Sequence, residues 1–248
     1  MAETGLAVRG LTAGYGQGAV ISDVALDVPY GQVLALVGRN GAGKSTTMKA
    51  IANLVTVLGG EVSVDGTPLA GLPTHRVALA GVAYVPEERR IFPGLTVEEN
   101  LQVTRRRGRG TRYWTLQRIY ETFPTLERLR RNLGAEMSGG EQQMLAMARA
   151  LAGDPKVMLL DEPSEGLAPL IVEELANLVL KLKEQGLAIL VSEQNLGFAD
   201  RVSDHAAVID RGVVRFSGTY AEFSSDPSLA RAYMSVGGPA APAASPTH

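Results

Sequence analysis

The stretch that decides the fold is Gly38-Arg39-Asn40-Gly41-Ala42-Gly43-Lys44-Ser45-Thr46. It matches G-x-x-x-x-G-K-[ST], a loop whose backbone N–H groups wrap the phosphates of ATP or GTP. Its glycines let the backbone curl, so that successive N–H groups point at one anion. Lys44 can bring a positive charge to the outer phosphates, and the Ser45 hydroxyl can ligate Mg²⁺. The stretch therefore predicts a nucleoside triphosphate site.

The sequence around this loop predicts a parallel sheet. Residues 32–37 form an apolar run typical of a buried strand, and residues 46–51 open a helix whose N-terminus adds its dipole to the site. Three later apolar runs, at 81–85, 157–161 and 187–191, are separated by helical patterns. Strands that alternate with helices are typical of a parallel sheet with helical crossovers.

The remaining segments predict two additions to this sheet and a tail. Short alternating stretches between Leu6 and Val28, and Glu61–Val64 before an Asp-Gly turn, predict a small antiparallel sheet in the same half as the loop. The stretch 96–152 has helical periodicity and many arginines, which predicts an inserted helical lobe. Residues 237–248 are rich in Pro, Gly and Ala, and we expect them to be disordered.

Composition narrows the class of protein. The chain has 248 residues, 45% of them hydrophobic, which suffices for one large α/β domain with an inserted lobe. A formal charge of −2 gives no general attraction to nucleic acid. With no cysteine there is no disulfide and no thiol nucleophile. No apolar run approaches the ~20 residues of a membrane span, and Met1–Thr4 lacks the features of a signal peptide, so we expect a cytoplasmic protein.

A second motif lies at the end of the apolar run 157–161, where Asp161 and Glu162 follow one another. At the carboxyl end of a parallel strand, both carboxylates would face the ligand crevice. Asp161 is placed to hold Mg²⁺, and Glu162 is placed to orient or deprotonate an attacking water. Next to a phosphate loop, this pair predicts a hydrolase site.

A third motif, Met137-Ser138-Gly139-Gly140-Glu141-Gln142-Gln143, precedes a strong helical pattern. Ser138 is a natural helix N-cap, and the two glycines leave N–H groups open to an anion. Because one loop already covers a nucleotide, a second anion-binding helix start suggests a nucleotide held by a partner. Here the chain resembles the ATP-binding subunits of ABC transporters, with Glu141 where many members carry glutamine. The resemblance runs from about Leu6 to Val236.

The resemblance implies an ABC-type ATPase fold of the α/β class over residues 1–236. Its catalytic lobe would comprise about 1–90 and 153–236, and its helical lobe about 96–152. It also implies a head-to-tail dimer with two ATP molecules between the chains. Each ATP would meet the phosphate loop of one chain, with Lys44 as a catalytic group, and the signature residues of the other. The implied residues are Tyr15 stacked on adenine, Gly38 to Thr46 in cis, and Ser138, Gly139, Gly140 and Glu141 in trans.

Three positions depart from the common family pattern. Glu87 stands where most members place a glutamine that touches Mg²⁺, so the implied metal ligands are Ser45, Glu87 and Asp161. Gln194 stands where a histidine contacts the γ-phosphate; an amide can hydrogen-bond the phosphate but carries no positive charge. Ala168 replaces an aspartate in the loop after Glu162. The acid–base chemistry would then rest on Glu162, with Gln194 and Lys44 beside it.

Two stretches resemble one subfamily, the ATPases of bacterial importers for branched-chain amino acids. They are residues 84–101 and Ser192-Glu193-Gln194-Asn195. The resemblance implies the smaller of two different ATPase subunits, bound under membrane permeases on the cytoplasmic face, with a periplasmic or lipid-anchored binding protein that delivers the solute. Importers for urea and short amides are similar, so the solute stays open. So do two other functions: a superfamily member acting in DNA repair or translation, and a nucleotide-binding module with little hydrolysis of its own.

Two further stretches have more than one interpretation. Ile91-Phe92-Pro93-Gly94-Leu95 puts apolar groups on a loop between the lobes, which suggests that Phe92 docks a permease helix. Packing under the helical lobe is the alternative. Arg105-Arg106-Arg107-Gly108-Arg109 with Arg112 is a basic run, which we interpret as a solvated surface. Contact with anionic lipid is the second interpretation and RNA binding the third, because the net charge is near zero.

Overall fold

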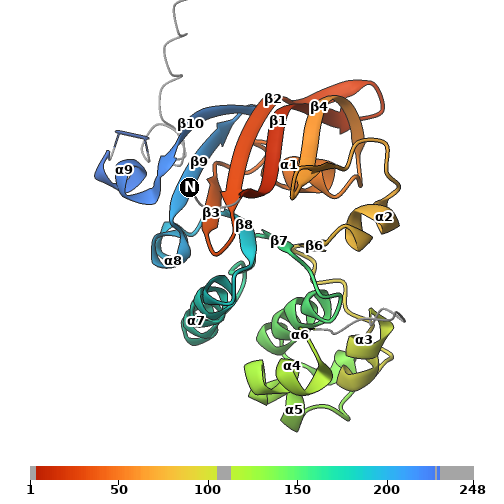
Figure 1. Cartoon of the computed structure of the whole chain (residues 1–248). Coiled ribbons are helices and arrows are strands. Elements are labelled where there is room, and N and C mark those ends of the chain that lie inside the picture. The colour runs from red at the N-terminus through yellow and green to blue at the C-terminus, as the bar shows by residue number, and fades with distance from the viewer. Residues whose placement is uncertain (1–3, 105–112, 227, 230–248) are drawn as a thin grey trace, which may run out of the picture.

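A computed structural model describes residues 4–104, 113–226 and 228–229. It contains two sheets and a set of helices, which Figure 1 shows in place. The basic run at 105–112 and the tail at 237–248 lie outside the described residues. The strands are β1 (Thr4–Tyr15), β2 (Gly18–Pro29), β3 (Val33–Val37), β4 (Thr56–Val64), β5 (Thr67–Pro68), β6 (Val82–Val85), β7 (Val157–Asp161), β8 (Ala188–Glu193), β9 (His205–Asp210) and β10 (Val213–Thr219).

The larger sheet has six strands in the order β10-β9-β3-β8-β7-β6. Its strands from β9 to β6 are parallel, and β10 joins the edge antiparallel to β9. The smaller sheet, β2-β1-β4-β5, is antiparallel throughout. The predicted combination of a parallel core sheet with a small antiparallel sheet is therefore confirmed.

The helices are α1 (Lys44–Ile51), α2 (Thr74–Leu79), α3 (Val97–Val103), α4 (Leu116–Thr122), α5 (Pro124–Arg128), α6 (Gly139–Leu151), α7 (Pro169–Glu184), α8 (Leu196–Val202) and α9 (Tyr220–Ser225), with a 3₁₀ turn, η1 (Gly134–Glu136). Helices α3 to α6 gather at one end of the molecule (Figure 1). They fall within 96–152, the range predicted for an inserted helical segment. None of the helices in the described residues is long and apolar enough to cross a bilayer.

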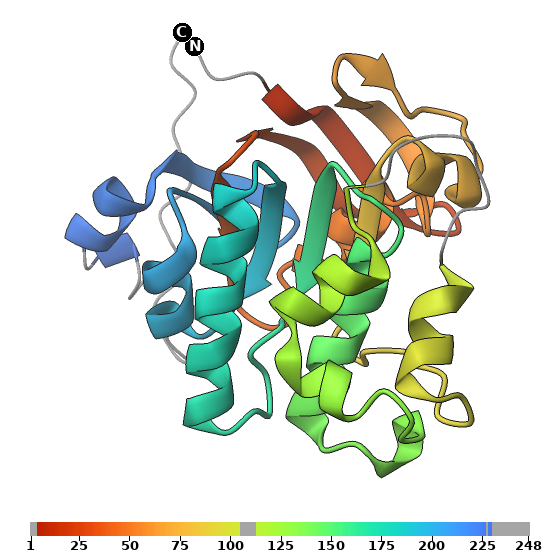
Figure 2. The same cartoon turned by 60° about the horizontal axis from the view of Figure 1, so that its bottom comes forward.

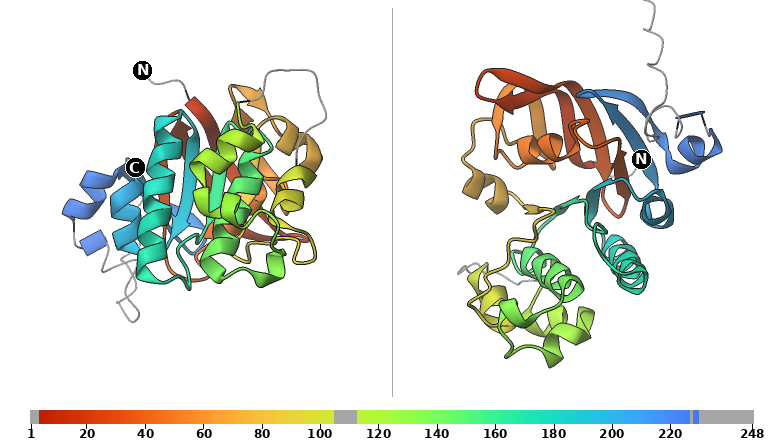
Figure 3. Two further views of the ribbon diagram at one scale, coloured as in Figure 1. Left: turned by 90° about the horizontal axis from the view of Figure 1, so that it is seen from below. Right: turned by 180° about the vertical axis from the view of Figure 1, so that it is seen from behind.

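Strand β3 shows how the larger sheet builds two cores. Val33, Ala35 and Val37 pack into a core with α6, α7 and α8, whereas Leu34 and Leu36 point to the other face. That second core includes the inner faces of β1, β2 and β4 and the buried side of α1. Figures 2 and 3 show the same layers, with α7, α8 and the helical end on one face of the sheet and α1 on the other. A strand buried on both faces reads as a continuous apolar run, as observed for β3.

Two strands differ in length from the sequence prediction. Strand β4 begins at Thr56, ahead of the expected Glu61, because Gly59 and Gly60 continue the strand instead of turning it. Gly60 has a φ of 86°, and a Cβ there would lie 2.3 Å from the Gly10 oxygen of β1, so the glycine permits a close approach of two strands. Strand β8 continues past Val191 through Ser192 and Glu193, which are polar but buried.

Candidate functional site at the carboxyl edge of the parallel sheet

The phosphate loop joins the end of β3 to the start of α1. Gly43 is the N-cap of α1 with a φ of 114°, a conformation that L-residues rarely adopt. A Cβ on Gly43 would lie 2.8 Å from Cγ2 of Ile21, and one on Gly38 would lie 2.3 Å from the Ile209 oxygen. The loop is thus held tightly against two neighbouring strands. The free N–H groups in the first turn of α1 then form an anion-binding helix end.

Lys44 is buried beneath the loop, with 5% of its side chain exposed. Its Nζ donates to the carbonyl oxygens of Gly38 at 2.7 Å and Arg39 at 3.1 Å, and it lies 3.0 Å from Oε1 of Glu162. The ammonium group is therefore fixed between the loop and the acidic end of β7. A buried ion pair of this kind stays stable only when further hydrogen bonds satisfy both groups, as the two carbonyls do here for Lys44.

Asp161 is held by three hydroxyl groups from three different segments. Its Oδ1 accepts hydrogen bonds from Ser45 Oγ at 2.9 Å and from Ser192 Oγ at 2.7 Å. Its Oδ2 accepts one from the Tyr84 hydroxyl at 2.8 Å. Burial and the neighbouring Asp161 charge raise the pKa of Tyr84 well above its usual value, so the hydroxyl keeps its proton and remains a donor.

Glu162 follows Asp161 in a strained conformation. Its φ of 46° is positive, which is uncommon for a residue other than glycine and costs about 1–3 kcal/mol. The backbone N–H donates to the Ser192 oxygen at 3.1 Å and to Ser192 Oγ at 3.0 Å. These bonds hold the turn and direct the carboxylate to Lys44.

Gln194 connects the phosphate loop with this acid. Its Nε2 donates to Asn40 Oδ1 at 2.7 Å and to Glu162 Oε1 at 3.1 Å. The structure thus brings together Lys44, Glu162 and Gln194, the three residues that sequence reasoning assigned to catalysis. One carboxylate oxygen of Glu162 therefore accepts from both the Lys44 ammonium and the Gln194 amide.

The three residues predicted to ligate Mg²⁺ are only partly assembled. Ser45 and Asp161 are in contact, and both offer the oxygen ligands that Mg²⁺ prefers. Glu87 is exposed, and no hydrogen bond joins it to either residue within the described part of the chain. Partial desolvation of the carboxyl group, followed by the charges of Glu165 and Asp161, raises the pKa of Glu87. Among the described residues, no three acidic or histidine side chains cluster closely enough to hold a metal by themselves. Mg²⁺ fits such a site, because it commonly keeps waters and binds through one or two protein groups and the substrate phosphates.

The residues predicted to bind nucleotide from a partner lie at the start of α6. Ser138 caps this helix, accepting from the Glu141 N–H at 3.4 Å, and Glu141 Oε2 accepts from both the N–H and the hydroxyl of Ser138 at 2.7 Å. A Cβ on Gly140 would lie 2.7 Å from Ile171 Cγ2 of α7. No hydrogen bond or ion pair among the described residues links this helix start to the phosphate loop of the same chain. Tyr15, at the end of β1, is 57% exposed.

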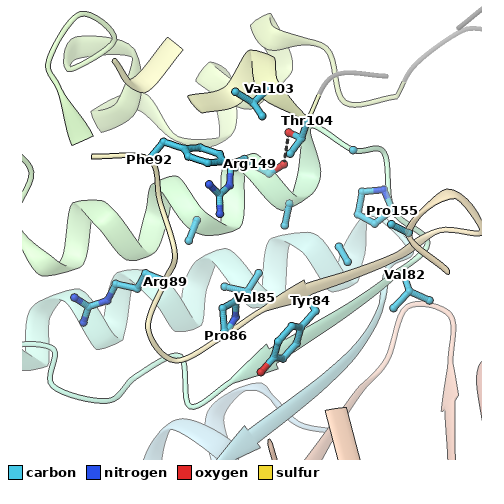
Figure 4. Close-up of a pocket in the computed structure, with 15 residues that line it drawn as sticks. Val82, Tyr84, Val85, Pro86, Arg89, Phe92, Val103, Thr104, Arg149 and Pro155 are labelled. Atoms are coloured by element: carbon cyan, nitrogen blue, oxygen red, sulfur yellow. Dashed lines mark hydrogen bonds between the residues drawn. The ribbon is translucent and has the colours of Figure 1, made fainter. Parts of the chain in front are cut away.

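Phe92 lies beside a pocket of about 420 Å³ between β6 and the helical end, drawn in Figure 4. The residue is 44% exposed, and its ring centre lies 5.0 Å from the guanidinium carbon of Arg149 on α6. Figure 4 shows these two side chains next to each other. Its backbone N–H donates to the buried Asn100 side chain, and its oxygen accepts from the same amide, both at 2.9 Å. The residue therefore packs on the helical end and still presents its ring to solvent.

Sequence reasoning missed Tyr84, Ser192 and Glu193. All three lie at the carboxyl ends of β6 and β8, where polar residues interrupt apolar runs. Asp161 pairs in register with Ser192, and Tyr84 pairs with Leu159, two residues before Asp161 and on the same face. Side chains alternate between the two faces of a sheet, and this alternation could have linked Tyr84 to Asp161 if the strand order had been known. The sequence does not state which strands are neighbours.

Comparisons with known proteins identify the family of this chain. A family model described as ABC transporter matches residues 21–165. The high-affinity branched-chain amino acid transport ATP-binding protein BraG of Pseudomonas aeruginosa is 37% identical over 221 residues, covering 89% of this chain and 95% of BraG. The chain belongs to the ABC transporter family. Within it, the chain is an ATP-binding subunit and an ATPase.

Other similar proteins are also ATP-binding proteins, but their names refer to different transport systems. The lipopolysaccharide export system ATP-binding protein LptB of Haemophilus influenzae is 34% identical, over 92% of this chain and 96% of LptB. A solved ATP-binding subunit of an ABC transporter is 31% identical with a TM-score of 0.79, covering 92% of this chain and 95% of that one. The dimeric structure of a bacterial ABC transporter cassette is 25% identical with a TM-score of 0.75, covering 86% and 98%. The ABC ATPase fold expected from the sequence is thereby confirmed.

The Tyr84 hydroxyl should contribute measurably to stability. Tyr84→Phe removes a hydrogen bond to a buried carboxylate, so we expect the free energy of unfolding to fall by about 1.5–3 kcal/mol. The control is Tyr120→Phe, because Tyr120 is a buried tyrosine whose hydroxyl has no hydrogen-bond partner among the described residues. Denaturant unfolding should show no loss for that variant. Equal losses at the two positions would contradict the assigned role of the Tyr84–Asp161 bond.

Proposed function

We propose that Lys44, Glu162 and Gln194 form the centre that hydrolyses ATP. The observation that carries this proposal is the position of Glu162 Oε1, 3.0 Å from Lys44 Nζ and 3.1 Å from Gln194 Nε2. Lys44 would neutralise charge on the outer phosphates, and Glu162 would accept the proton of the attacking water. Gln194 would orient Glu162 and hydrogen-bond the γ-phosphate, in place of a histidine.

Residues Gly38 to Thr46 would hold the phosphates through backbone N–H groups, with Arg39, Asn40 and Gly41 at the exposed turn of the loop and Ala42 buried behind it. Ser45 and Asp161 would hold Mg²⁺, with Glu87 as a further oxygen ligand at the mouth of the site. The ion would neutralise charge that develops on the phosphates. Tyr15, exposed at the end of β1, would stack on the adenine ring.

Hydrolysis would require two ATPase domains arranged head to tail. Ser138, Gly139, Gly140 and Glu141 would then contact the nucleotide held by the other chain. The dimeric cassette reported above, which covers 86% of this chain, supports such an assembly. The helical lobe at about 96–152 would carry this contact, and the catalytic lobe at about 1–90 and 153–236 would carry the phosphate loop. We propose a different ATPase as the partner, following the subfamily that the sequence resembles.

The transporter would be an importer for branched-chain amino acids on the cytoplasmic face of the membrane. Support comes from the stretch 84–101, from Gln194 and from the likeness to BraG. The name of LptB, which is 34% identical, refers to an export system, so overall identity does not distinguish the solutes. Residues 84–101 and Gln194 are what favour branched-chain amino acids. A permease helix would dock in the pocket beside Phe92, and a solute-binding protein would act indirectly through the permease. No nucleic acid takes part.

Lys44→Ala tests the phosphate site. Losing a charged hydrogen bond of about 1.5–3 kcal/mol should weaken ATP binding roughly 10- to 100-fold, measured by titration with a fluorescent ATP analogue. Lys49→Ala is the control, because Lys49 lies in the last turn of the same helix. Wild-type affinity in Lys44→Ala would mean that the phosphates bind elsewhere.

Glu162→Gln tests the general base. The variant keeps a hydrogen-bond acceptor for Lys44 but takes up no proton, so turnover should fall about 10²- to 10⁴-fold while ATP binding persists. Phosphate release and equilibrium binding measure the two effects separately. Glu173→Gln, an exposed acid on α7, should hydrolyse ATP at the normal rate. If Glu162→Gln retained turnover, the base would have to be another residue.

The transport assignment is tested by affinity purification from gently solubilised membranes, with mass spectrometry of the recovered proteins. Wild type should recover two polytopic permeases and a second ATPase. Phe92→Asp should lose the permeases, because it places a charge at the docking pocket, whereas Leu58→Asp should keep them. The two positions are matched, with 44% and 45% exposure, and Leu58 lies on β4 outside the pocket. Recovery of permeases by Phe92→Asp would exclude that docking surface, and recovery of ribosomal partners alone would remove the transport proposal.

A further inference from the structure

Glu193, the last residue of β8, is a buried carboxylate to which no role has yet been given. Only 1% of its surface is exposed. Its Oε1 accepts from the Ser164 N–H at 3.0 Å, and its Oε2 accepts from the N–H groups of Gln194 and Asn195 at 3.2 Å each. One oxygen therefore serves the loop after Glu162, and the other serves the turn that carries Gln194.

A carboxylate is costly in this position. No lysine, arginine or histidine in the described residues forms an ion pair with Glu193, and burial raises its pKa to about 7. An apolar residue would avoid that cost but would leave several backbone N–H groups without acceptors. A glutamine would turn an N–H₂ group toward one of the two loops, because only a carboxylate accepts on both oxygens. The requirement to bind two loops at once accounts for an acid here.

The two loops that Glu193 joins also meet inside the candidate site. Ser164 follows Glu162 by two residues, Gln194 follows Glu193 directly, and the Gln194 side chain donates to Glu162 at 3.1 Å. We propose that Glu193 is a positioning residue for ATP hydrolysis, which fixes the loop of Glu162 and the turn of Gln194 relative to each other. This inference rests on the catalytic roles proposed above for those two residues. A displacement of about 1 Å in such a pair can lower the rate about 10²-fold.

The test compares Glu193→Ala with a matched control, Asp204→Ala, in the full-length chain. Asp204 is also an acid that accepts a backbone N–H from another element, that of Val33 at 2.8 Å, but it directly precedes β9, at the end of the parallel strands opposite the site. Amide hydrogen exchange should become at least about 10-fold faster in both 163–168 and 194–197 for Glu193→Ala, and in neither segment for Asp204→Ala. The turnover number of Glu193→Ala should fall at least about 10-fold, with the dissociation constant for ATP within about threefold of wild type.

Three results would overturn the inference. They are unchanged exchange in either segment, an unchanged turnover number, or a fall in turnover number that Asp204→Ala shows equally. Hydrogen exchange needs no turnover, so it decides the role of Glu193 even if Glu162→Gln shows that the base lies elsewhere. Gln194→Ala tests whether Glu193 acts through Gln194 or only through the loop of Glu162. If it hydrolyses ATP normally while Glu193→Ala does not, the proposed role of Gln194 fails and Glu193 acts through the loop of Glu162.

Discussion

The parallel register of β3, β8 and β7 is the constraint on which the site depends. Val37 pairs with Glu193, and Asp161 pairs with Ser192, so all three strands end at one edge of the sheet. The phosphate loop, the two acids and the turn of Gln194 leave the sheet from that edge within hydrogen-bonding distance of one another. Carboxyl ends of parallel strands form such ligand crevices because each strand continues into a loop on the same side.

The same edge concentrates polar groups in an otherwise apolar sheet. Asp161, Glu162, Ser192 and Glu193 are all buried, and each has hydrogen-bond partners from another loop or strand. Buried polar groups are stable only when they are satisfied, and a satisfied network permits few alternative arrangements. The strained φ of Glu162 persists because its N–H is bonded to Ser192 and its carboxylate to Lys44. The strain at this edge is thus accompanied by a fixed geometry of the candidate site.

Sequence patterns predicted the fold class, the phosphate loop and the paired acids, because each is local. Glycine spacing, an apolar run and two adjacent carboxylates suffice to recognise them. The contacts of Tyr84 and Glu193 were not predictable in the same way, because they depend on which strands are neighbours. The extension of β4 back to Thr56 was not predictable either, because Gly60 permits the strand to pass close to β1 and the sequence does not show that approach. Non-local register is the information that local patterns do not contain.

The start of α6 illustrates how one residue meets two requirements. Glu141 completes a capping box with Ser138, and its negative charge stabilises the N-terminal end of the helix dipole. A phosphate from another chain would seek the same N–H groups and the same dipole, and it would be repelled by the carboxylate. Because Glu141 Oε2 is already bonded to the N–H and hydroxyl of Ser138, a nucleotide that binds there must displace or share this bond. Glutamine would present no such charge, so in the proposed dimer Glu141 would make the approach of a second nucleotide more dependent on the backbone of Gly139 and Gly140.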